Sequence, residues 1–70
     1  MSIVQANLKR IIDDKGLVQK GVAKRAGIPE KAFSAIMTGR KVIRADMIPA
    51  LAAAVDEPIA ELFRAEEKGA

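Results

Sequence analysis

The sequence predicts an all-α fold, a compact domain of five short helices that occupies residues 1–70. Apolar residues recur at the spacing of amphipathic helices, and glycines and prolines interrupt them where short helices would be joined by tight turns. A chain of 70 residues forms one domain at most. Its 50% hydrophobic and 30% charged residues are ordinary for a globular protein and too apolar for a disordered one.

The first helix is expected over Ser2–Asp14, because its apolar residues share one face. Ser2 and Gln5 fit a capping box at its start, and Gly16 suits the left-handed residue that follows a helix. The residues expected to face inward are Val4, Leu8, Ile11 and Ile12.

Two shorter helices are expected next, over Val18–Ala26 and Pro29–Met37. Gly27 breaks the chain between them, and Pro29 suits the first turn of a helix because its missing N–H has no partner to lose there. Gly39 is expected to close the third helix. The residues expected to face inward are Val22, Ala23, Ala26, Phe33 and Ile36.

The fourth helix is expected after a basic loop, Arg40–Arg44, and begins near Ala45 or Asp46. Asp46 is a plausible N-cap, which places Pro49 at the third helical position, where proline is tolerated. Its expected inner residues are Ile48, Leu51, Ala54 and Val55.

The fifth helix is expected to begin near Glu57 or Pro58, and residues 65–70 are expected to fray. Its expected inner residues are Ile59, Leu62 and Phe63.

Charge is distributed unevenly along the chain. The segment Lys15–Arg44 holds eight basic residues and a single acid, Glu30, a net charge of +7. The segment Ala45–Ala70 holds two basic and six acidic residues, a net charge of −4. A basic middle joined to an acidic end favours one face for a polyanion, although a solvated helical surface would give a similar pattern.

Several classes of function are disfavoured by what the sequence lacks. There is no cysteine and no histidine, which removes disulfides, thiolate chemistry and the commonest metal ligand and general base. The serines Ser2 and Ser34 have no plausible base beside them, so we expect no enzyme and no cofactor. Neither a leader-like segment nor a membrane span is evident, and the sequence is interpreted as that of a cytoplasmic protein.

The segment Gln19–Thr38 has the pattern of two short helices joined by a tight glycine turn. A small residue is needed where the helices cross, and Ala23 supplies it. Four residues later, Gly27 supplies the positive φ of the turn. Flanking apolar residues close the corner: Val22, Ala26, Ile28, Phe33 and Ile36.

This segment resembles the helix-turn-helix of the phage repressor and Cro (XRE-type) family. The resemblance extends to Gly39-Arg40-Lys41 after the third helix and to Leu51–Phe63, so it covers most of the chain. The sequence departs from the family pattern at four positions, none of which breaks the motif. They are Val18 in place of a capping Thr or Ser, Gly21 within a helix, Phe33 in place of a branched aliphatic residue, and Pro49 in place of leucine.

The resemblance implies that the third helix enters the major groove of double-stranded DNA. By position, the residues implied to face base edges are Glu30, Lys31, Ser34 and Ala35. Gln19 is implied to bind a phosphate and support its neighbour, and the residues implied to hold phosphates are Lys20, Thr38, Arg40, Lys41 and Arg44. For Glu30 the alternative is an acid that only complements the helix dipole, and any single cation can be merely a solvated charge.

The function implied is that of a sequence-specific transcriptional regulator, a small Cro-like repressor that binds a palindromic operator as a homodimer. The dimer surface is expected in the fourth and fifth helices. Ile43 is expected to fill the core, the alternative being that Val42 and Ile43 lie at a partner interface. A second hypothesis is an antitoxin or adaptor whose main partner is another protein, held by the C-terminal region; no membrane partner is expected.

Overall fold

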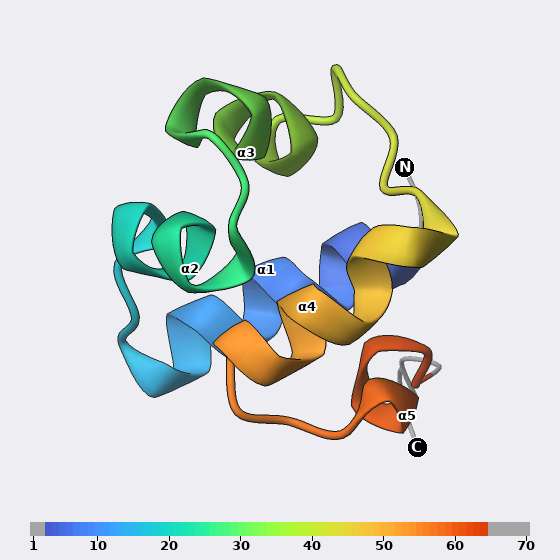
Figure 1. Cartoon of the computed structure of the whole chain (residues 1–70). Coiled ribbons are helices and arrows are strands. Elements are labelled where there is room, and N and C mark those ends of the chain that lie inside the picture. Colours follow the sequence, from blue (N-terminus) through green and yellow to red (C-terminus); the bar gives the residue numbers. More distant parts are fainter. Residues whose placement is uncertain (1–2, 65–70) are drawn as a thin grey trace.

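The computed structural model describes residues 3–64, and all regular secondary structure in this range is helical. The elements are α1 (Ile3–Lys15), α2 (Gln19–Ala26), α3 (Glu30–Met37), the 3-10 turn η1 (Ala45–Met47), α4 (Ile48–Ala54) and α5 (Ile59–Leu62). The prediction of an all-α chain with five α-helices is therefore confirmed (Figure 1).

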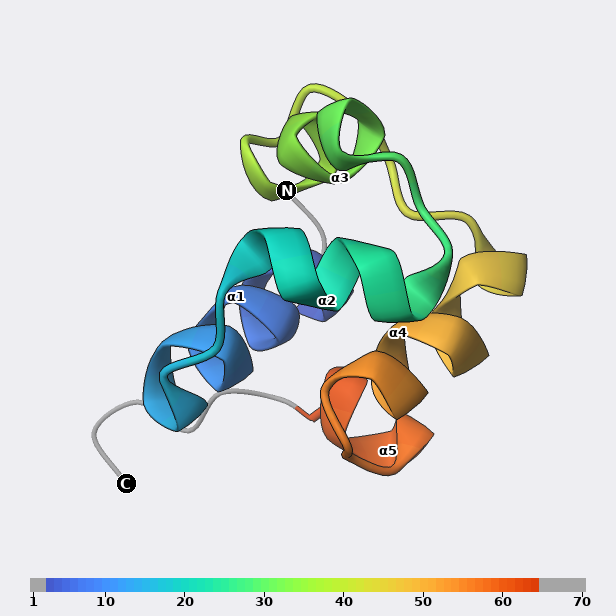
Figure 2. The ribbon, with the colours of Figure 1, turned by 60° about the vertical axis from the view of Figure 1, so that its left-hand side comes forward.

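The helices pack in a way that leaves α3 at one end and α5 at the other (Figures 1 and 2). α2 makes its most extensive contacts with α4, while α1 contacts both α3 and α5. One core lies between them, and all the expected inner residues of the first four helices contribute to it, with Ala26 only partly buried at its edge. Ile43 also packs against this core, as expected, whereas Val42 is 79% exposed.

Four helices end in the same backbone arrangement, the Schellman motif, in which one residue takes a left-handed conformation. In each case the N–H of the residue after it donates to a carbonyl five positions earlier, at 2.8–3.0 Å, after α1, α2, α3 and α4. The left-handed residues are Gly16, Gly27, Gly39 and Asp56. The three glycines were predicted to occupy these turns, but Asp56 was not.

Two predicted helix starts were wrong. Pro29 is the N-cap of α3 rather than a residue of its first turn, and its carbonyl accepts the N–H of Phe33 at 2.9 Å. Asp46 does not cap α4, because the chain first makes the turn η1 and the carboxylate lies 3.6 Å from the guanidinium of Arg44. Pro49 therefore occupies the second rather than the third position of α4.

The expected burial of the fifth helix was wrong at two of three positions. Leu62 is fully buried, but Ile59 is 44% exposed and Phe63 is 50% exposed. The physical reason is that α5 has only four residues, so this single turn presents one side chain to the core, and Phe63 lies beyond its end. Ser2 and residues 65–70, on which a capping box and a frayed tail were predicted, lie outside the described residues.

Candidate nucleic-acid interface

α3 has two faces of opposite character. Phe33, Ile36 and Met37 are buried and fix the helix on the core. Glu30, Lys31 and Ser34 are exposed, and the small side chain of Ala35 is half-buried between the two faces. Of the four residues that were predicted to face base edges, the structure thus brings three to the solvent side of one helix and places Ala35 at the border of that side.

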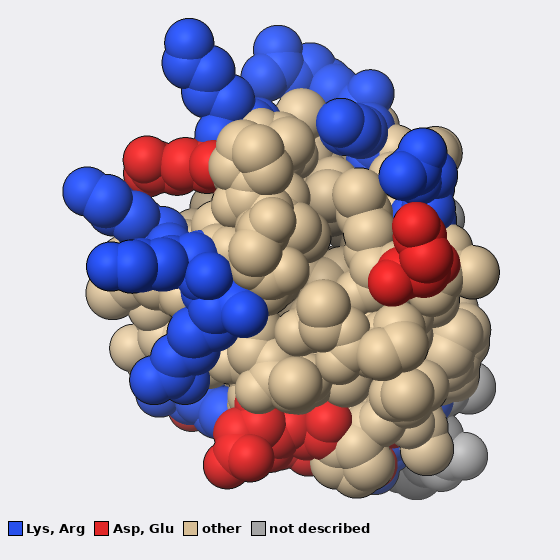
Figure 3. All heavy atoms as spheres, viewed as in Figure 1, with Lys and Arg blue, Asp and Glu red and all other residues tan. Residues whose placement is uncertain are grey.

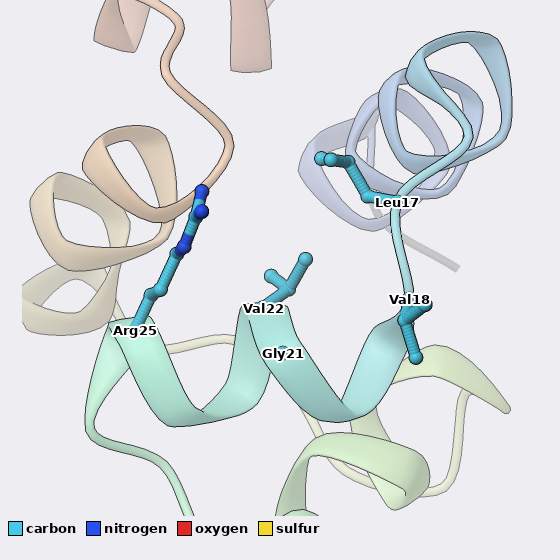
Figure 4. A pocket seen from close by; sticks show the side chains of 5 residues that line it. All are labelled: Leu17, Val18, Gly21, Val22 and Arg25. Carbon is cyan, nitrogen blue, oxygen red and sulfur yellow. The ribbon is translucent and has the colours of Figure 1, made fainter.

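The start of α2 exposes the predicted phosphate-binding residues Gln19 and Lys20. The preceding residue, Val18, provides no side-chain cap, as its departure from the family pattern implies. Gly21 is exposed, and a Cβ built on it would meet no atom within 4 Å, so the packing of the described residues does not require a glycine there. A hollow of about 120 Å³ lies beside it, lined by Leu17, Val18, Gly21, Val22 and Arg25 (Figure 4).

The segment after α3 exposes the remaining predicted residues: Thr38, Arg40, Lys41 and Arg44. Arg44 is the only one of them with an ion pair to another described residue, namely Asp46, and both side chains are about 70% exposed. Figure 3 shows Lys and Arg side chains along the top and left of this face, over α3, the following loop and α2. Acidic side chains lie at the lower edge and also beside basic side chains at the left and at the right of this view.

Two cations of the basic segment are engaged within the fold instead. Lys15 Nζ donates to the carbonyl oxygens of Val55 at 2.7 Å and Asp56 at 3.2 Å, and it lies 2.8 Å from a carboxylate oxygen of Glu57. Arg25 reaches from α2 to the carbonyl of Ala54 at 3.4 Å (Figure 4). Both satisfy carbonyls at the end of α4, where a helix dipole favours positive charge. The net charge of +7 therefore overstates what the basic segment offers to a ligand.

Sequence reasoning did not identify the residue that joins α1 to α3. The buried side chain of Gln5 donates from Nε2 to the carbonyl of Met37, the last residue of α3, at 2.8 Å. Asn7, also buried, likewise donates to the carbonyls of Leu62 at 2.9 Å and Arg64 at 2.7 Å and so joins α1 to α5. The only hint of these contacts in the sequence was the presence of two amide side chains, Gln5 and Asn7, in the apolar stretch at the start of α1.

No helix in residues 3–64 combines the length and the apolar character needed to span a membrane. A comparison with protein families matches residues 7–68 to the model of the Cro/C1-type HTH DNA-binding domain. Comparison with curated proteins and with solved structures gives no significant match. The matched range includes α2, α3 and every residue predicted to contact DNA. The chain therefore belongs to the family of Cro/C1-type helix-turn-helix DNA-binding domains, which supports a role as a DNA-binding transcription regulator.

Proposed function

We propose that the protein is a small Cro-like repressor that acts in the cytoplasm and binds a palindromic operator as a homodimer. The observation that carries this proposal is the continuous outward surface made by α3 and the turn behind it. Within residues 3–64, Lys31, Arg40 and Lys41 make no ion pair with an acidic side chain, so their charges are available to a polyanion. DNA phosphates are such a partner.

The outward face of α3 reads the bases in this proposal. Lys31 donates to the acceptors of guanine, and Ser34 pairs as donor or acceptor. Glu30 accepts from the amino group of cytosine and disfavours other bases, because an unpaired carboxylate would face the negative field of DNA. The half-buried methyl group of Ala35 contacts a thymine methyl or simply permits close approach.

Phosphate contacts from two segments hold this helix in place. Gln19 and Lys20 contribute from the start of α2, and Arg40, Lys41 and Arg44 contribute from the loop after α3. The exposed turn residue Thr38 belongs to the same surface. Such contacts set the position of the protein along DNA without reading sequence.

Dimer formation is supported by the exposed apolar side chains at α5. Ile59 and Phe63 lie close together in sequence. Each is about half exposed, although both side chains are apolar. A second copy that covered them would remove this surface from water. Two such subunits would bind half-sites about 34 Å apart on the DNA.

The decisive experiment is binding of the full chain to random-sequence duplex DNA at several salt concentrations, followed by selection of the bound fraction. A steep fall in affinity with salt and enrichment of a palindromic site support the proposal, and the spacing of half-sites reports the dimer geometry. Enrichment of a single half-site would refute the homodimer, and absence of binding at low salt would refute the DNA-binding role.

A second candidate function, an antitoxin or adaptor, is favoured by the same exposed residues of α5. The double variant Ile59→Ser with Phe63→Ser separates the two functions, since both side chains are already partly in water and the core residue Leu62 is untouched. Sedimentation should show a dimer that becomes a monomer, with operator affinity reduced. If the wild-type chain is monomeric and its DNA affinity is unaffected by the changes, the surface serves a different protein.

A further inference from the structure

The turn after α3 is held to the helix by three backbone N–H donors. The carbonyl oxygen of Ala35 accepts the N–H of Arg40 at 2.8 Å and the N–H of Lys41 at 3.1 Å. Gly39 N–H donates to Ile36 at 3.2 Å, and the left-handed conformation of Gly39 makes this arrangement possible. The backbone that carries Arg40 and Lys41 is therefore fixed on the last turn of α3. The fixed point is Ala35, whose methyl group borders the face proposed to read the bases.

The hydroxyl of Thr38 is already hydrogen-bonded within the chain, whereas a side chain that binds a phosphate needs a free donor. Its Oγ1 donates its single hydrogen to the last turn of α3, where the carbonyls of Ser34 and Ala35 lie at 3.0 and 3.2 Å. The same oxygen accepts a hydrogen bond from Nε of Arg40 at 3.4 Å. A phosphate oxygen can only accept hydrogen bonds, so it would compete with these carbonyls for the hydroxyl hydrogen.

We propose that Thr38 is a positioning residue for Arg40, rather than a phosphate ligand, and that it holds the guanidinium in register with α3. The inference rests on the proposed function. With Nε of Arg40 directed at Thr38, the two terminal nitrogens remain for a phosphate, which accepts such paired donors well. Because phosphate contacts set the position along DNA, the expected effect is on recognition of the operator rather than on overall electrostatic attraction.

The test uses variants that alter the hydrogen bond without altering charge. Thr38→Val removes the hydroxyl at similar size, Thr38→Ser retains it, and Arg40→Lys keeps the charge but lacks the planar Nε donor. Thr38→Val should weaken binding to the selected operator by about three- to tenfold, the range for one hydrogen bond, with an unchanged salt slope. Thr38→Ser should bind as the wild type does.

The double variant decides between positioning and direct contact. If Thr38 acts through Arg40, Thr38→Val should cause no further loss in the Arg40→Lys background. An equal loss in both backgrounds would show a direct phosphate contact and overturn the inference, and so would a Thr38→Val variant with wild-type affinity. Thermal unfolding of each variant checks that the compared proteins are folded at the binding temperature.

A measurement without DNA keeps this inference separate from the proposed function. Exchange of the Arg40 Nε hydrogen with water should be slowed in the free wild-type chain, faster in Thr38→Val and restored in Thr38→Ser. Rapid exchange in the wild type would overturn the positioning role while leaving DNA binding intact. Slowed exchange in a chain that binds no DNA would show that the hydrogen bond exists. It would nevertheless refute the DNA-binding role and, with it, the role of Thr38 in positioning Arg40 for DNA.

Discussion

The turns after α3 and after α4 share one backbone design but treat positive charge in opposite ways. Each has a left-handed residue, Gly39 or Asp56, and each returns an N–H to a carbonyl five positions earlier. After α3, the cations belong to the turn itself and are exposed to solvent. After α4, the cations come from other helices and donate to carbonyls at the helix end.

This difference shows that a basic residue can either be exposed to a ligand or stabilise the fold. The groups that surround it in the structure determine which of the two roles it has. Lys15 and Arg25 lie in the same basic segment as Lys31 and Arg40. The first two satisfy the end of α4. Within residues 3–64, Lys31 makes no ion pair, and the side chain of Arg40 donates to an uncharged hydroxyl. Substitution at the two turns should therefore separate DNA affinity from stability.

The largest effect is expected from reversing charge at the turn after α3. Arg40→Glu with Lys41→Glu should weaken binding to all DNA by on the order of 100-fold or more, because two charge-assisted contacts become repulsive. The salt slope should become shallower by about two per subunit. Titration against specific and random duplexes at several salt concentrations measures both. As a comparison, Lys31→Ala should relax the choice of base at one or two positions, and identical behaviour of the two variants would mean that α3 has been assigned wrongly.

The reciprocal change at the turn after α4 should affect stability alone. Lys15→Ala removes two carbonyl contacts and one ion pair, and the side chain is about one-third exposed, so we expect a loss of about 1–2 kcal/mol in the free energy of unfolding. Denaturant unfolding measures the loss, and DNA affinity at a temperature where the variant is folded should stay unchanged. Lys9→Ala, at an exposed lysine of α1, is the matched control and should change neither property.

A pair of glycine substitutions sharpens the comparison further. Gly16→Ala and Gly39→Ala each force alanine into a left-handed conformation with open space around the new methyl, so each should destabilise the protein by about 1 kcal/mol. Only Gly39→Ala should also weaken DNA binding, since only its turn carries Arg40 and Lys41. Equal affinity of the two variants would contradict the role of that turn.

The smallest effect is expected at Asp56, where a side chain occupies a left-handed position that glycine prefers. Asp56→Gly should raise the free energy of unfolding by about 0.5–1 kcal/mol, because the strain of the left-handed residue outweighs the added freedom of the unfolded chain. Asp56→Ala should lower it, since alanine lacks the tolerance of aspartate for this region. A thermal scan distinguishes the three proteins, whose DNA affinities should be the same.

Local rules predicted most of the fold, because most of its elements are decided locally. The apolar spacing of α1 identified its buried face, and Gly16, Gly27 and Gly39 identified the turns. The rules failed where two local options compete. Asp46 suits an N-cap, but a turn of 3-10 helix and an ion pair with Arg44 are equally short-range alternatives. The burial of Ile59 and Phe63 depends on the length of α5, because a helix of one turn presents only one side chain to the core. The spacing of apolar residues in the sequence does not give this length.

The candidate site was predictable as a set of positions but not as a set of contacts. Pattern matching placed Lys31 and Ser34 on the solvent face of α3, and the structure places them there. It did not find that Gln5 fixes the end of α3, since that contact joins residues 32 positions apart. Nor did it find that the hydroxyl of Thr38 donates to its own helix, because a threonine at a helix end can either donate to carbonyls three or four residues earlier or point to a ligand.

The open position at Gly21 makes the protein a convenient subject for optical spectroscopy. The chain contains no cysteine, so Gly21→Cys would provide a single thiol for attachment of a fluorophore. A Cβ at this exposed site would meet no atom of a neighbouring element within 4 Å, and a non-glycine residue suits a helix interior better. Because the label would lie two residues from Gln19, its emission would report the arrival of DNA in real time without alteration of any residue assigned to binding.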